Sequence, residues 1–171
     1  MTETHSCPSE FTPDGLMTWL DELGVDAELI VSEQQMPSVE LAARTIGVDP
    51  NQIVKTLLFR DRAGKYARVI ASGPRRIDRA KLATIAGLDR PKMASPEAVL
   101  EITGWPAGGV APVGNRLPIP TFIDQSVMHW DVVFGGGGTE LTLIRMKPID
   151  MVRLTGAVIA DLLERPTPAG G

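Results

Sequence analysis

Lys55 is the residue of this sequence whose type and position point most directly to chemistry. It lies within NQIVKTLLF (residues 51–59), where the neighbouring side chains are apolar or β-branched, as in a buried strand entered from a turn. A lysine in such a run either extends its ammonium to water along apolar surface, or presents it in a cleft to an anion or a polarised carbonyl. This stretch alone leaves both alternatives open.

Two glycine-rich segments are candidate ligand-binding loops. GGVAPVG (residues 108–114) combines glycines, which permit unusual backbone angles, with a proline that stiffens the chain, so it can hold backbone N–H and C=O groups in a fixed arrangement. GGGGTE (residues 135–140) lies between predicted strands and lacks the spacing of a dinucleotide-binding fingerprint or a Walker loop. We therefore expect no cofactor, and the tetraglycine alternatively forms a loose hairpin.

Residues for nucleophilic or metal-dependent catalysis are scarce. The two histidines are His5, near the start, and His129, beside Trp130, and the single cysteine, Cys7, lies in a polar leader. A Ser-His-Asp or Cys-His enzyme would depend on His129 alone, and a lone histidine beside a tryptophan more often has a structural role. No pair of His, Cys or Asp has the spacing of metal ligands, so we expect no metal site. If the protein is an enzyme, its chemistry must rely on Lys55, backbone donors and the substrate.

Composition and charge predict one globular domain, and we expect it to be in the cytoplasm. The 171 residues, 43% hydrophobic and 22% charged, suffice for one core, and they include neither an apolar run of membrane-spanning length nor a signal-peptide pattern. The net charge of -4 hides an asymmetry, because residues 51–100 hold eleven bases and four acids. Six of these bases form either a solvated surface or a docking site for phosphates: Arg75, Arg76, Arg79, Lys81, Arg90 and Lys92.

Helix and strand signals are mixed without regular alternation. Residues 55–59 and 65–72 are predicted to pair as a hairpin across RDRAG, and further strands are expected at 121–124, 131–134 and 140–146. Helices are predicted at 14–24, 39–47, 79–87 and 96–104, with Asp14, Ser38, Asp78 and Ser95 as caps, and at 147–156. The pattern predicts a single α+β domain over residues 13–163, between a disordered leader (1–12) and a disordered tail (164–171).

Five segments of the chain carry a family resemblance. They are AARTIGVDPNQIVKTLLF, SGPRRIDRAKLATIAG, ASPEAVLEITGWPAGGVAPVG, LPIPTFIDQSV and LTGAVIADL, in this order within about residues 25–162. The sequence resembles the YbaK/ProX family of trans-acting aminoacyl-tRNA deacylases, which is similar to the editing insertion domain of bacterial prolyl-tRNA synthetases. The resemblance implies a single α+β domain with a curved, mixed, mostly antiparallel sheet flanked by helices. The implied activity is hydrolysis of the ester that joins a wrong amino acid to tRNA.

The same resemblance implies a substrate site. Lys55 matches the functional lysine of the family, and its G-x-x-x-P substrate loop falls on Gly108, Gly109, Val110, Ala111 and Pro112. Leu29 or a neighbour replaces an aromatic residue that several relatives carry. The polar residue that follows the glycine hairpin in relatives is Glu140 or Thr142. The remaining expected substrate-binding residues are Gly136 and Gly137.

The leading interpretation is a free-standing editing enzyme. We expect hydrolysis of a small amino acid, cysteine or alanine, from tRNA(Pro), with Arg75, Arg76, Arg79 and Lys81 contacting tRNA. Aminoacyl-tRNA is then the substrate and prolyl-tRNA synthetase a candidate partner, with no membrane and no metal involved. The alternatives are a non-catalytic module that docks tRNA or a synthetase, and an enzyme that forms a Schiff base on Lys55.

Overall fold

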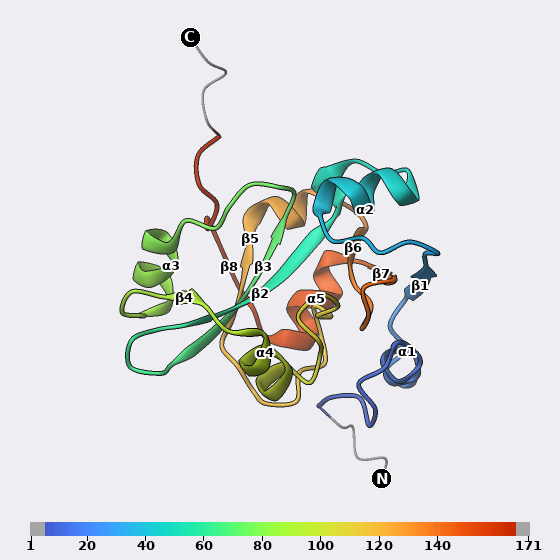
Figure 1. Cartoon of the computed structure of the whole chain (residues 1–171), viewed down its shortest axis with the longest axis horizontal. Helices are drawn as coiled ribbons and strands as arrows, with labels where there is room; N and C mark the ends of the chain where they lie inside the picture. Colours follow the sequence, from blue (N-terminus) through green and yellow to red (C-terminus); the bar gives the residue numbers. More distant parts are fainter. Residues whose placement is uncertain (1–5, 167–171) are drawn as a thin grey trace.

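The computed structural model describes residues 6–166. This part of the chain alternates irregularly between helices and strands (Figure 1). The elements are α1 (Pro13–Glu22), β1 (Ala27–Val31), α2 (Val39–Ile46), η1 (Pro50–Gln52), β2 (Val54–Arg60), β3 (Tyr66–Ser72), α3 (Arg79–Ala86), β4 (Lys92–Met93), α4 (Pro96–Thr103), β5 (Thr121–Asp124), η2 (Gln125–His129), β6 (Val133–Gly136), β7 (Thr142–Met146), α5 (Pro148–Thr155) and β8 (Val158–Ala160).

The strands form two sheets. One has the order β1-β7-β6 and is antiparallel throughout, and the other has the order β4-β2-β3-β5-β8. In the larger sheet β2 pairs antiparallel with β3 and β4, whereas β3, β5 and β8 run parallel. An isolated bridge between Ile53 and Phe134 joins the two sheets. The predicted α+β class with mixed, mostly antiparallel pairing is confirmed, and the expected single curved sheet is divided into two joined sheets.

Three apolar clusters hold the elements together. The largest packs α1 and α5 against both sheets and includes Trp105 and Met151, which are fully buried. A second lies between α3 and the larger sheet, around Leu82. The third fixes α2 over the junction of the sheets, where Ala42 and Ala43 meet Ile53, Phe134 and Leu143. This third cluster positions α2 beside β2, the strand that carries the candidate lysine.

Helix starts largely follow the predicted capping residues. Ser38, Asp78 and Ser95 each accept hydrogen bonds from amides of the first turn that follows. The cap of α1 was predicted wrongly as Asp14, because the Thr12 hydroxyl instead accepts from Gly15 N at 3.0 Å. Pro13 occupies the first helical position, where its missing N–H costs nothing, so the capping role falls on the residue before it.

Residues 6–12, which the sequence assigns to a leader, pack on the domain. Pro8 is buried, and the ring of Phe11 meets Trp105 edge-on with 5.1 Å between ring centroids. The remainder of the predicted leader, residues 1–5, and the last five residues of the predicted tail, 167–171, lie outside the described part. Within residues 6–166, no helix has the length and apolar character that crossing a bilayer requires.

Candidate active site

Lys55 lies near the start of β2, where it pairs with Ala71 of β3. Its Nζ donates to the carbonyl oxygen of Gly73 at 3.1 Å and to that of Arg75. Both acceptors belong to the loop that follows β3, so the ammonium ties this loop to the beginning of β2. The lysine is half-buried rather than extended into water, which favours the cleft-facing alternative.

The electrostatic surroundings of Lys55 act in opposite directions. Burial, the largest influence, lowers the pKa of its ammonium, while the negative charge of Glu40 raises this pKa. The Arg75 charge lowers the pKa further, and the buried Asp124 carboxylate raises it. The net effect is a pKa below the ordinary value of 10.5, because the influence of burial outweighs that of the two carboxylates.

Lys55 opens into a cavity of about 480 Å³ that it shares with the glycine loop. Gly108 and Val110 supply the loop side of this cavity, and Gly136 and Glu140 supply the side of the β6–β7 hairpin. Its rim is formed by the segment before α2 and the first turn of that helix, from Met36 to Val39, so its walls are largely apolar. More than fifty residues separate Lys55 from the loop in sequence, and the fold brings them to one site.

Glycines allow the loop and the hairpin to touch along their backbones. A Cβ on Gly136 would lie 2.1 Å from the carbonyl oxygen of Val110, and one on Gly109 would lie 2.5 Å from the Thr139 nitrogen. The Gly138 amide donates to the Gly109 carbonyl at 2.9 Å. Any side chain at these two glycines would therefore push the loop away from the hairpin, which explains the glycine-rich character of both segments.

Two backbone amides of the loop are available to a ligand. The Gly109 amide donates to the Pro106 carbonyl at 2.9 Å, whereas the amides of Gly108 and Val110 have no acceptor among the residues that the structure describes. Gly108 and Val110 both line the cavity. Preorganised amides of this kind can stabilise the negative charge that develops on a carbonyl oxygen during ester hydrolysis.

Glu140 and Thr142, the two candidates for the polar residue of the site, are placed differently. Glu140 lines the cavity, where its Oε2 accepts from Gln35 Nε2 at 2.8 Å. Thr142 is buried, and its hydroxyl pairs with that of Thr139 at 2.9 Å inside the turn. Gly137 likewise serves the turn, since its amide donates to the Thr142 carbonyl. Glu140 is thus the polar residue that faces the site.

Other predicted substrate residues lie outside the cavity lining. Leu29 lies in β1 and pairs with Ile144 of β7. Its neighbour Ile30 packs against the apolar cluster under α2, which includes the cavity residue Leu143. Successive strand residues face opposite sides, so Leu29 points away from this cluster. Ala111 is fully buried in the main core. Pro112 is buried too, and a Cβ on Gly135 would lie 3.1 Å from its Cγ.

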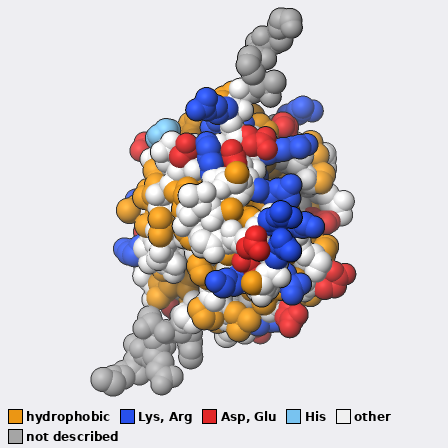
Figure 2. All heavy atoms as spheres, turned by 90° about the vertical axis from the view of Figure 1, so that its left-hand side faces the viewer, with side chains coloured by type: hydrophobic (Ala, Val, Ile, Leu, Met, Phe, Trp, Pro, Cys, Tyr) orange, Lys and Arg blue, Asp and Glu red, His pale blue; other side chains and the backbone are white. Residues whose placement is uncertain are grey.

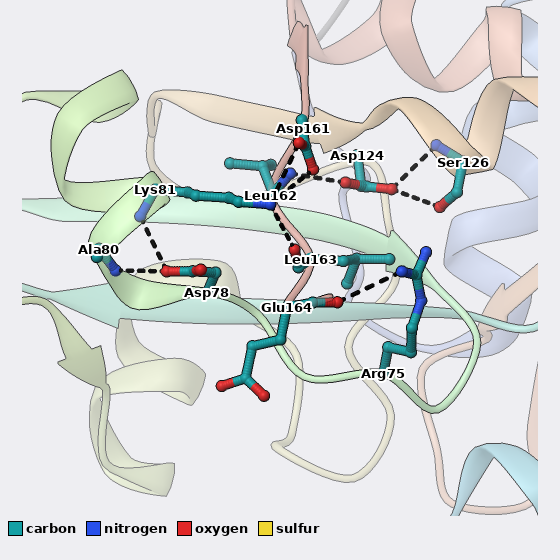
Figure 3. A network of polar contacts seen from close by, with 10 residues as sticks. All are labelled: Arg75, Asp78, Ala80, Lys81, Asp124, Ser126, Asp161, Leu162, Leu163 and Glu164. Carbon is teal, nitrogen blue, oxygen red and sulfur yellow. Dashed lines mark hydrogen bonds and ion pairs between the residues drawn. The ribbon is translucent and has the colours of Figure 1, made fainter. Parts of the chain in front are cut away.

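The predicted tRNA-contacting residues differ in the partners that their charged groups have within the protein. Lys81 Nζ meets both carboxylate oxygens of Asp161 at 3.2 Å and the Leu163 carbonyl at 2.9 Å (Figure 3). Arg75 donates to the Glu164 carbonyl at 3.3 Å from an exposed position. Arg76 and Arg79 are exposed. Figure 2 shows that basic side chains gather on the face of the molecule that carries α3 and β4.

Sequence reasoning did not identify a second, larger cavity beside the Lys55 site. It measures about 790 Å³ and is lined by Arg75 together with Ser72, Ser126 and Trp130. The loop whose carbonyls hold Lys55 also forms part of the wall of this second cavity, through Pro74 and Arg75. Gln35 and Glu40 were also missed, and Glu140 was left open beside Thr142, because the sequence does not show which distant residue a polar side chain will meet.

The chain is similar in sequence to curated proteins and in sequence and fold to a solved structure. A "Proline--tRNA ligase" of Desulfotalea psychrophila is 30% identical over 70% of this chain, which matches 20% of that ligase. The "Putative Cys-tRNA(Pro)/Cys-tRNA(Cys) deacylase EbsC" of Enterococcus faecalis is 25% identical over 73% of this chain and 76% of its own length. A solved structure titled "Crystal structure of a putative trans-editing enzyme for prolyl tRNA synthetase" is 34% identical, with a TM-score of 0.75, over 81% of this chain and 87% of the other.

A sequence model of a known protein family matches most of the chain. The model described as "Aminoacyl-tRNA editing domain" matches residues 33–154 and so includes Lys55, the glycine loop and the hairpin. The resemblance predicted from the sequence is confirmed by this match and by the relatives. The chain belongs to the aminoacyl-tRNA editing domain family.

Proposed function

We propose that the protein is a trans-editing deacylase that hydrolyses the ester of tRNA(Pro) charged with cysteine or alanine. Membership of the aminoacyl-tRNA editing family supports the enzyme class. The chain covers 76% of a relative whose name describes a Cys-tRNA(Pro)/Cys-tRNA(Cys) deacylase, which supports a substrate of this class. A cytoplasmic location is part of this proposal.

The observation that carries the proposal is the meeting of one cation and two free amides at one cavity. Lys55, Gly108 and Val110 line the same space of about 480 Å³. An aminoacyl ester is already activated, so a site needs only to hold it, polarise its carbonyl and admit a nucleophile. We assign polarisation of the carbonyl to the amides of Gly108 and Val110, since such donors contribute about 3 to 4 kcal/mol to transition states of acyl transfer.

Lys55 acts on the tRNA side of the ester. We propose that its ammonium attracts the terminal ribose-phosphate, while its two backbone acceptors hold it in place. Water attacks the ester carbonyl carbon, the bond to the ribose oxygen breaks, and the amino acid leaves with a free carboxylate. Where the amino acid is cysteine, its own thiol can attack first: the sulfur bonds to the carbonyl carbon, the ribose oxygen leaves and takes the thiol proton, and water then opens the resulting cyclic thioester.

Glu140 recognises the amino acid. An esterified amino acid keeps a free ammonium, and the Glu140 carboxylate is the acidic group that lines the cavity. Gln35 holds one of its oxygens at 2.8 Å, which limits its movement. The apolar rim between Met36 and Val39 then faces the substrate side chain. One methylene in such a pocket changes binding by about 1 to 3 kcal/mol, so this rim sets the preference between small amino acids.

Exposed arginines bind the body of the tRNA. We propose that Arg75, Arg76 and Arg79 contact phosphates, whereas Lys81, whose charge is matched by Asp161, maintains the fold. Arg75 lines the second cavity and belongs to the loop whose carbonyl groups hold Lys55, so it carries a positive charge beside the Lys55 site.

A panel of mischarged tRNAs tests the proposal. Cys-, Ala-, Ser- and Pro-tRNA(Pro), and Cys-tRNA(Cys), are incubated with the protein and with Lys55→Ala, and the remaining ester is measured over time. Selective loss of Cys- or Ala-tRNA(Pro) with the wild type supports the proposal. Binding of tRNA without hydrolysis of any ester would instead support the alternative of a non-catalytic tRNA-binding module. Borohydride trapping of a carbonyl substrate on Lys55 would indicate a Schiff-base enzyme.

A further inference from the structure

Arg68 is a buried arginine with an incomplete set of partners. It lies in β3 with 3% of its surface exposed. Its Nε and Nη2 both donate to the hydroxyl oxygen of Thr121, at 3.1 and 3.0 Å. That hydroxyl donates in turn to the Ile119 carbonyl at 3.0 Å. Nη1 is buried and has no hydrogen-bond partner among the described residues.

No acidic group offsets the Arg68 charge within the described part of the chain. Burial alone lowers its pKa, to about 9, so the guanidinium remains charged at neutral pH. A buried charge without a counter-ion costs several kcal/mol. The carbonyl end of α5 lies nearby, since Leu154 and Thr155 share a cavity with Arg68, but no carbonyl of that helix accepts a hydrogen bond from the guanidinium.

A cavity of about 270 Å³ adjoins Arg68. One water molecule takes up about 30 Å³ of liquid volume, so this space admits a group much larger than a single water. Its wall contains Arg116, Asn115, Ser6 and Thr155, and none of the residues that line it is acidic. The cavity is therefore lined by two cations and by neutral groups.

Two further side chains with hydrogen-bonding capacity belong to residues that line this space. The Asn115 side-chain oxygen is buried without a partner, and a half-turn of the amide would present its NH₂ group as a donor instead. Arg116 stacks on the ring of Phe11 at 5.2 Å and has no carboxylate partner in the described chain. Neither Arg68 nor Arg116 therefore has a carboxylate partner among residues 6–166.

We propose that this cavity binds a phosphate group, held by the guanidinium groups of Arg68 and Arg116 and by the side-chain amide of Asn115. Arginine forks match the oxygens of a phosphate, and binding would supply the charge that Arg68 lacks. Inorganic phosphate and the phosphate of a nucleotide share this chemistry. The cavity has no lining residue in common with the Lys55 cavity, so the site is separate from the editing site and does not depend on the proposed function.

Thermal unfolding with added phosphate tests the site. Inorganic phosphate is titrated against chloride at equal ionic strength, with Arg62→Met as a control because Arg62 is exposed and does not line this cavity. At phosphate concentrations about 100-fold above the dissociation constant, the melting temperature should rise by about 5 to 11 °C in the wild type and the control. Arg68→Met should abolish the rise. Arg116→Ala, a change at an exposed residue, should weaken phosphate binding several-fold even if Arg68→Met does not fold.

Further arms separate the sources of the phosphate. A larger rise with adenosine monophosphate than with inorganic phosphate assigns the site to a nucleotide, and the reverse assigns it to the free ion. An equal rise in wild type and Arg116→Ala would overturn the proposal, as would no rise in the wild type.

Discussion

Replacing Lys55 by alanine is the most direct perturbation of the candidate site. The change removes an ammonium that donates to the carbonyl oxygens of Gly73 and Arg75. Buried hydrogen bonds to charged groups contribute about 1.5 to 3 kcal/mol each, but cavity water can replace the ammonium at both carbonyls. We therefore expect a loss of about 1 to 2 kcal/mol in the free energy of unfolding. For a domain of this size that lowers the melting temperature by about 2 to 8 °C.

The effect of Lys55→Ala on hydrolysis should be much larger than its effect on stability. The variant removes the cation from a cavity that it shares with Gly108 and Val110. Loss of one preorganised group that stabilises developing charge reduces rates by about 100- to 1000-fold. We expect kcat/KM for the preferred aminoacyl-tRNA to fall within this range. Lys55→Arg keeps the charge but has a planar, wider head, so it should recover little activity.

Single-turnover deacylation, measured beside thermal unfolding, separates the two effects. Lys65→Ala is the matched control, since Lys65 is an exposed lysine in the turn between β2 and β3. The control should keep the wild-type rate. Wild-type activity in Lys55→Ala would refute the assigned role. Lost activity together with a collapse of the melting temperature well beyond the expected range would show that the lysine serves the fold.

Four further outcomes are expected. Gly136→Ala places a Cβ 2.1 Å from a loop carbonyl, so it should lower stability by about 1 to 3 kcal/mol and reduce kcat/KM. Glu140→Gln should raise KM for esters with a free α-ammonium and change little for N-acetylated esters. Arg76→Ala with Arg79→Ala should weaken tRNA binding and flatten its salt dependence. The catalysed rate should fall as pH rises through the lowered pKa of Lys55, because the cation is then lost.

Controls distinguish these outcomes from general damage. Gly156→Ala strains a left-handed position with open space around it, so it should lower stability without affecting hydrolysis. Equal rates for Gly136→Ala and wild type would show that the loop need not contact the hairpin. If the salt dependence of tRNA binding were unchanged in the double arginine variant, Arg76 and Arg79 would be solvated surface residues that do not contact tRNA. For Lys55 the native state binds fewer protons than the unfolded state, so its contribution to stability should rise with pH, opposite to activity.

Local sequence determined most elements and the identity of the candidate site. Ser38, Asp78 and Ser95 began helices as predicted, because capping depends on hydrogen bonds to amides two or three residues away. The β2–β3 hairpin followed from two strand signals around a short turn. Lys55 stood out because a charge within an apolar run is costly unless it has a partner.

Only the tertiary structure decided which residues meet. Glu140 faces the cavity and Thr142 does not, because the tight turn directs the Thr142 hydroxyl onto Thr139. Lys81 forms an ion pair with Asp161, eighty residues away. From composition alone, Lys81 would be taken for a base without a partner. The unmatched charge of Arg68 also has no local signal. Hydrogen bonds and ion pairs between distant segments depend on how sheets and loops pack, so the sequence determines which charges exist and the fold determines which of them remain available to a ligand.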